Sequence, residues 1–168
     1  MKTLRLHIVC LLLAVVSYGC GIYSFSGASI PAEAKTVSVQ YFPNQAPLIN
    51  PTLSNDFTTA LRDAVMNQTS LDMEESGGDL SFEGEITDYR TTPVAITAGQ
   101  TAAVNRLTIT VNVRFNNRFD ETKNFESKFS HYQDYPSDQD LNSVQESLTG
   151  EIIEALVEDI FNKALVNW

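Results

Sequence analysis

The chain has 168 residues, of which 11 are basic and 21 are acidic, giving a formal net charge of −10 at neutral pH. This acidic balance argues against nucleic acid as a general partner, because nucleic-acid binding relies on clustered Lys and Arg side chains. Cys10 lies in the predicted leader described next, so the mature chain would keep Cys20 as its only thiol. One thiol excludes both a disulfide framework and a cysteine-based metal site.

Residues 1–19 have the pattern of a secretory signal. Lys2 and Arg5 precede an apolar run of about ten residues that ends at Gly19, whereas a membrane-spanning helix needs about twenty. Cleavage before Cys20 resembles the signal of bacterial lipoproteins, in which this cysteine becomes the acylated first residue. Ser17 departs from that pattern, which prefers Leu three positions before the cysteine. The alternative is an ordinary secretory signal cut nearby, or one retained in the membrane.

Lipidation at Cys20 would fix the protein to a membrane by its N-terminus. Two or more acyl chains, palmitate among them, anchor a protein stably where a single chain binds only marginally. Residues 20–35 are small, polar and bounded by proline, which predicts a lipidated tether. Residues 36–168 predict a single domain with one core. Loss of Lys2 and Arg5 would leave nine basic residues against 21 acidic ones, a mature net charge of −12.

The first part of the predicted domain contains one strand and one helix. Apolar and polar side chains alternate over residues 36–42, which predicts a half-buried strand. Asn50 as N-cap and Pro51 as the first helical residue predict a helix over 51–68, with one apolar face. The acidic segment 72–79 is predicted to be a solvated turn, because it lacks the ligand spacing of a calcium loop.

Three more strands and a long helix follow. The strands are predicted over residues 80–90, 102–115 and 122–135, with a hairpin turn at 116–123. An amphipathic helix over 140–166 closes the predicted domain. The order β-α-β-β-β-α predicts an α/β (α+β) two-layer sandwich, in which two helices pack on one face of a four-stranded mixed sheet. A right-handed crossover would join the first two strands.

The sequence shows no catalytic constellation. His131 would be the only histidine of the mature chain, and no G-x-S-x-G or S-x-x-K pattern surrounds a serine. We expect His131 to be a strand residue packed near the sheet edge, because it lacks partners for a catalytic or metal role. The prediction is a protein that is not an enzyme and that uses no metal and no cofactor.

An uncharged, partly apolar stretch over residues 91–105 is the first candidate binding element. It joins two predicted strands and is flanked by Arg90 and Arg106. Exposed apolar surface often marks a contact site, which makes this stretch a candidate partner loop. The alternative is that the stretch simply extends the two strands. The candidate partner contacts are Pro93, Val94, Ile96 and Gly99.

The outward face of the strand over 102–115 is the second candidate. Six of the nine mature basic residues fall between positions 90 and 128. Basic side chains on a polar sheet face can bind phosphates or carboxylates. The alternative is a sheet face that is merely solvated. The candidate ligand-binding residues are Arg90, Arg106, Arg114 and Lys128.

The assembled order resembles the LptE family of lipopolysaccharide-assembly lipoproteins. The resemblance is carried by the lipoprotein signal at Cys20, by the strand-opening pattern GQTAAVNRLTITVNVRF, and by FSHYQDYP leading into VQESLTGEIIEALVEDIFNKAL. Two further segments resemble the branch of that family found in Bacteroidetes, namely CGIYSFSGASIP and VSVQYFPN. The resemblance covers nearly the whole chain.

The resemblance implies an outer-membrane lipoprotein that faces the periplasm and plugs the lumen of an LptD-like β-barrel. Barrel and plug together would pass lipopolysaccharide to the cell surface, with lipopolysaccharide itself as a further candidate partner. Basic side chains assist lipopolysaccharide contact in the family, but no motif maps a named one onto this chain. The acidic net charge of the mature chain argues against direct binding of lipopolysaccharide phosphates more than against plugging of the barrel. The alternatives are an auxiliary lipoprotein of another envelope lipid-transport or secretion complex, and a lipid-modifying or hydrolytic enzyme.

Overall fold

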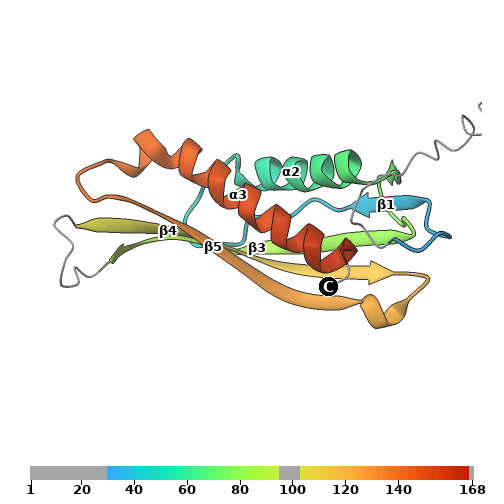
Figure 1. Cartoon of the computed structure of the whole chain (residues 1–168). Helices are drawn as coiled ribbons and strands as arrows, with labels where there is room; N and C mark the ends of the chain where they lie inside the picture. The colour runs from blue at the N-terminus through green and yellow to red at the C-terminus, as the bar shows by residue number, and fades with distance from the viewer. Residues whose placement is uncertain (1–29, 95–102, 167–168) are drawn as a thin grey trace, which may run out of the picture.

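The computed structural model describes residues 30–94 and 103–166, which form a layer of two long helices on a five-stranded sheet (Figure 1). The strands are β1 (Thr36–Val39), β2 (Asp72–Glu74), β3 (Leu80–Val94), β4 (Val104–Asn117) and β5 (Phe125–Pro136). The helices are α2 (Leu53–Gln68), the short 3-10 helix η1 (Glu121–Lys123) and α3 (Leu141–Leu165). The predicted mixed two-layer sandwich is confirmed, with one strand more than expected.

The sheet has the order β2-β1-β3-β4-β5. β1 pairs in parallel with both β2 and β3, and β3, β4 and β5 pair antiparallel in sequence order. Parallel neighbours need a crossover connection, and α2 supplies it between β1 and the strands that follow. The long antiparallel part of the sheet is therefore built from hairpins, and its short parallel edge from the helix connection.

The extra strand β2 lies in the acidic segment that was predicted to be a turn. Its residues pair in parallel with the start of β1, with Thr36 opposite Asp72. Asp72 and Glu74 are exposed, and Met73 between them is partly buried and packs against the core. Three residues are too few for this alternation to be recognised in the sequence. The prediction of a turn was therefore wrong for residues 72–74, where backbone pairing with β1 and the packing of Met73 on the core hold an edge strand. Residues 75–79, which connect β2 to β3, lie outside any strand.

The start of α2 also differs from the prediction. The helix begins at Leu53, and its N-cap residue is Thr52, whose side chain makes no capping hydrogen bond. Asn50 instead accepts hydrogen bonds from the Thr52 N–H at 3.1 Å and the Thr52 hydroxyl at 3.2 Å. Asn50 and Pro51 therefore form the turn before the helix, and their predicted positions as N-cap and first helical residue were wrong.

A β-bulge in β3 decides which of its side chains face the helices. The register with β4 shifts between Ile86 and Asp88. Strict alternation from Leu80 would turn Asp88 and Arg90 toward the core. The bulge instead buries Tyr89, which is 1% exposed, and leaves Arg90 exposed.

The core lies between the helix layer and one face of the sheet. Alternate residues of β4 are fully buried, and so are the apolar stripes of α2 and α3. Burying each such side chain contributes about 1.5–3 kcal/mol. The central members are Phe57, Leu61, Val65, Leu107, Ile109, Val111, Val113, Ile152, Leu156 and Ile160.

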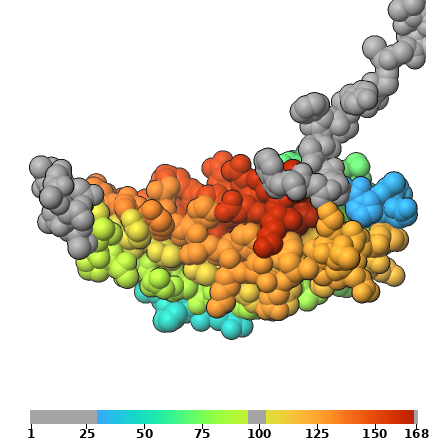
Figure 2. Space-filling model, turned by 60° about the horizontal axis from the view of Figure 1, so that its bottom comes forward, coloured from blue at the N-terminus to red at the C-terminus, as the bar shows by residue number. Residues whose placement is uncertain are grey.

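Both helices lie on the same side of the sheet, as predicted (Figure 1). The other side is formed by side chains of β3, β4 and β5 (Figure 2). We call this surface the open sheet face and define it by the outward-facing residues Glu83, Glu85, Asp88, Arg90, Arg106, Thr108, Thr110, Asn112, Arg114, Glu126, Lys128, Ser130, Tyr132 and Asp134.

Candidate binding surfaces

The chain enters the domain beside the end of the last helix. Ile30 and Pro31 line a small hollow together with Ala164 and Leu165 of α3. The predicted signal, the lipidation site Cys20 and most of the predicted tether lie outside the described residues. Among the described residues, no helix has the length and apolar character needed to span a membrane.

The uncharged stretch that was a candidate partner loop continues both long strands at its two ends. Pro93 pairs with Asn105 and Val94 pairs with Val104, so the hairpin of β3 and β4 reaches at least these positions. Pro93 is exposed, and Val94 is partly buried. The candidates Ile96 and Gly99 lie outside the described residues.

The four candidate basic residues all lie on the open sheet face. Arg90 forms an ion pair with Asp88 on the same strand. Arg114 lies 3.4 Å from a carboxylate oxygen of Glu85 and 3.9 Å from one of Glu126. β4 thus holds a cation between acidic residues of its two neighbouring strands.

Arg106 has the most constrained geometry of the four. Its Nε and Nη2 atoms donate to the two carboxylate oxygens of Asp134 at 2.7 and 2.8 Å. Its guanidinium also stacks on the ring of Tyr132, 3.6 Å from the centroid. The hydrogen bonds from Arg106 lower the pKa of Asp134, although burial acts in the opposite direction. The same hydrogen bonds to the Asp134 carboxylate raise the pKa of Arg106.

Lys128 differs from the three arginines. It is exposed on β5 and lies opposite Asn112 of β4. Among the residues that the structure describes, no carboxylate lies within 4 Å of its ammonium group. Asn112 donates to Glu85 and Glu126, both at 2.9 Å, so the centre of the face is a hydrogen-bonded polar network. An anionic ligand would meet Lys128 as an unpaired charge and would have to compete with carboxylates at the arginines.

His131 lies on the helix side of β5, as the alternation predicts. Its Nε2 atom lies 2.6 Å from a carboxylate oxygen of Asp159 on α3. This contact ties the edge strand to the covering helix. Within the described part of the chain, no cluster of His, Cys, Asp and Glu is suited to hold a metal ion.

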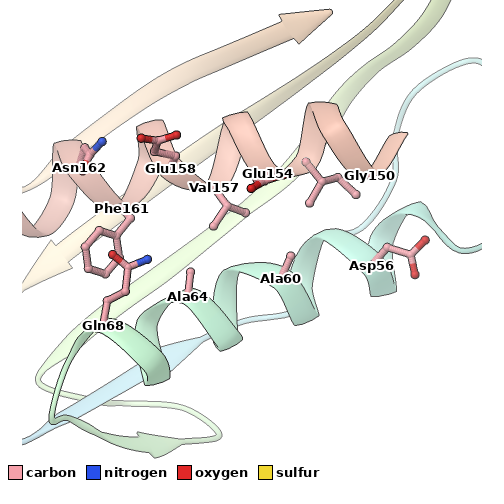
Figure 3. Close-up of a pocket in the computed structure, with 11 residues that line it drawn as sticks. Asp56, Ala60, Ala64, Gln68, Gly150, Glu154, Val157, Glu158, Phe161 and Asn162 are labelled. Carbon is pink, nitrogen blue, oxygen red and sulfur yellow. The ribbon is translucent and has the colours of Figure 1, made fainter. Parts of the chain in front are cut away.

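A groove between α2 and α3 is a surface that the sequence analysis missed (Figure 3). It has a volume of 590 Å³ and lies on the outside of the helix layer. Each helix was recognised by its apolar stripe, but a groove depends on how two helices lie together. The helical spacing of Ala60 and Ala64, small residues beside the apolar stripe of α2, was the signal available in the sequence.

Comparison with curated protein sequences gives no match. Among solved structures, the fold is similar to a minor lipoprotein from Acinetobacter baumannii, at 15% identity and a TM-score of 0.50 over 77% of this chain and 91% of that one. It is also similar to the hypothetical protein CT253 from Chlamydia trachomatis, at 13% identity and a TM-score of 0.53 over 77% and 95% of the two chains.

A third similar structure is a putative neuraminyllactose-binding hemagglutinin homolog from Helicobacter pylori, with 10% identity, a TM-score of 0.52 and coverage of 84% and 88%. At these identities the structures establish a shared fold. The family model LptE, described as lipopolysaccharide-assembly, matches residues 34–164, which includes every described helix and strand except the last residue of α3. The chain therefore belongs to the LptE lipopolysaccharide-assembly family.

Proposed function

We propose that this protein is an outer-membrane lipoprotein that plugs an LptD-like β-barrel and assists its assembly for lipopolysaccharide transport. The observation that carries the proposal is the family match over residues 34–164. In the proposed arrangement, acyl chains on Cys20 hold the protein at the periplasmic side of the membrane. The tether would connect this anchor to the domain entrance at Ile30.

The surface of the domain suits a place inside a barrel. Lumens of large outer-membrane barrels are polar, so a plug must present polar groups outward. The open sheet face does so with ion pairs and a hydrogen-bonded network across three strands. The action is structural: a plug stabilises the folded barrel and closes it to leakage, and no turnover is involved.

Lipopolysaccharide contact is a second part of the proposal. Lipid A carries phosphates, and arginine can bind phosphate with two parallel hydrogen bonds. Arg90, Arg106 and Arg114 would exchange their carboxylate partners for phosphate, whereas Lys128 needs no exchange. The hairpin end at Pro93 and Val94, with Ile96 and Gly99, is the proposed contact with the barrel.

An auxiliary role in another envelope transport or secretion complex remains the competing function, although the family match favours lipopolysaccharide assembly. Depletion of the protein in its own cells distinguishes the two. We expect loss of the folded LptD-like barrel from the outer membrane and loss of lipopolysaccharide from the surface. Unchanged barrel abundance and surface lipopolysaccharide after depletion would refute the proposal.

A further inference from the structure

The groove between α2 and α3 is shaped for an elongated occupant. The two helices run side by side in the same direction (Figure 3). The groove continues toward their N-terminal ends as a second hollow of 750 Å³, and the two hollows share Asp56, Gly150 and Ile153. From Asp56 to Gln68 the wall formed by α2 is about 18 Å long, at 1.5 Å per helical residue.

The floor of the groove is made of small and apolar side chains. Ala60 and Ala64 face α3 across it, and Val157 and Phe161 face α2 (Figure 3). Val157 and Phe161 are buried, while the two alanines are partly buried. The floor therefore offers apolar contact, with space for another chain to approach closely.

Gly150 is a second indication that something else packs here. Glycine in the interior of a helix costs about 1 kcal/mol relative to alanine. A Cβ atom at Gly150 would meet nothing within 4 Å, so the fold itself does not require a glycine there. An occupant whose backbone comes close to α3 would require it.

A buried hydroxyl without a partner lies in the second hollow. Thr149 is 4% exposed and lines this hollow, and its Oγ1 atom has no hydrogen-bond partner. A buried hydroxyl left unpaired costs about 1–3 kcal/mol. A polar group of the occupant that reaches Thr149 would remove this cost.

The rim of the groove carries negative charge only. Asp56, Glu154 and Glu158 line the first hollow, and Glu146 lines the second. No Lys, Arg or His is among the described residues that line either hollow. Such a rim attracts cations and repels the phosphates of lipopolysaccharide and of anionic lipid surfaces.

We propose that this groove binds a polypeptide segment of the barrel partner in which Lys or Arg residues flank small apolar side chains. The apolar side chains would pack on Ala60 and Ala64, and the cations would pair with the acidic rim. The inference rests on the proposed function, because it takes the barrel as the source of the segment. It assigns the two faces of the domain different ligands, with protein at the helix layer and phosphate at the open sheet face.

The first test is photo-crosslinking in intact envelopes with the full-length lipoprotein. A photoreactive residue replaces Ala64 in the groove, and Met66 serves as the control position because it is 49% exposed on the same helix and does not line the groove. We expect position 64, and not position 66, to crosslink to a Lys- or Arg-bearing segment of the barrel. Crosslinking to lipopolysaccharide, crosslinking to a second copy of the chain, or no crosslink would overturn the inference.

The second test reverses the charge of the rim. Glu154→Lys combined with Glu158→Lys should lower the amount of barrel that copurifies by about tenfold, because like charges would then face each other. Glu75→Lys is the control, since Glu75 is exposed in the turn between β2 and β3, away from the groove. Circular dichroism and thermal unfolding show whether each variant is folded.

The two proposals fail in different ways. If the barrel copurifies equally with the wild type and with the rim variant, the groove inference is wrong and the plug proposal stands. If no barrel copurifies with the wild type, the plug proposal is wrong and the inference falls with it.

Discussion

The same chemical change, glycine to alanine, should have opposite effects at two positions of this domain. Gly84 lies in β3 with a φ of +158°, and a Cβ atom there would lie 2.0 Å from the backbone oxygen of Asn112 and 2.7 Å from the ring of Phe42. Neither a backbone oxygen of the neighbouring strand nor a fully buried ring can move away freely. The sheet would have to part locally to accept the methyl group.

The size of the Gly84 effect follows from two contributions. Overpacking a buried site costs about 1–3 kcal/mol, and a backbone conformation unfavourable to L-residues adds about 1 kcal/mol. We expect Gly84→Ala to lower the free energy of unfolding by about 3 kcal/mol. For a domain of this size that corresponds to a fall in Tm of about 6–12 °C.

Gly150→Ala should instead stabilise the isolated protein. The added Cβ meets nothing within 4 Å, and alanine favours the helix by about 1 kcal/mol. The expected rise in Tm is about 2–4 °C. An additional expectation follows if the groove binds a partner segment: a bulkier change such as Gly150→Leu would weaken barrel binding although the domain stays folded.

The assay is urea and thermal unfolding of the detergent-purified wild type and of each single variant, followed by circular dichroism. If the free energy of unfolding falls with urea concentration at the same slope in the wild type and the variants, all of them expose the same amount of surface on unfolding. If Gly84→Ala unfolded at the wild-type temperature, the claim that β4 and Phe42 leave no room for a Cβ atom at Gly84 would be refuted. If Gly150→Ala were less stable than the wild type, the claim that a Cβ atom at Gly150 meets open space would be refuted.

Three further predictions concern charge and lipid. Asp79 and Asp134 have lowered pKa values, through hydrogen bonds from the Lys35 backbone and from Arg106, so their contribution to stability should be present above about pH 4 and lost as pH falls through the folded pKa values. Urea titrations at a series of pH values should show that the free energy of unfolding falls less steeply below about pH 4 in the variant that combines Asp79→Asn with Asp134→Asn. An equally steep fall in the variant and the wild type would contradict this. Cys20→Ser should abolish palmitate labelling and release the protein from membranes; labelling that persists would refute lipidation at this residue. Lys128→Ala should weaken lipopolysaccharide binding about two- to fivefold in a salt-sensitive manner, and equal binding by the variant would remove Lys128 from the proposed contact.

The elements found correctly in the sequence are those with a strong apolar period. β4 buries alternate residues, and α3 buries a wide stripe along one face. Each of these patterns can be recognised in the sequence of the element alone. The order of strands and helices then restricts the layers to a two-layer sandwich.

The elements that were missed depend on contacts between distant segments. β2 is three exposed or half-buried residues held by backbone pairing with β1. The bulge at Ile86 and Asp88 appears only when β3 is aligned with β4. β2 is too short to show a period. In β3 the buried positions shift from Leu80, Phe82 and Ile86 to Tyr89, but this break in the alternation does not by itself show that a bulge lies there.

The candidate surfaces show the same division. Alternation correctly placed Arg106 and Arg114 away from the core. It gave no information on their carboxylate partners, because Asp134 and Glu85 belong to neighbouring strands. The face expected to be basic therefore contains mostly paired cations, whereas the charged side chains that line the α2/α3 groove are all acidic.

The most direct test of the central claim is the identity of the stoichiometric partner. The tagged full-length lipoprotein is purified by affinity from detergent-solubilised envelopes, and the copurifying proteins are identified and quantified by mass spectrometry. The plug proposal predicts a single large LptD-like barrel at a ratio of one to one. An inner-membrane transporter, a secretion subunit or the absence of any partner would contradict it.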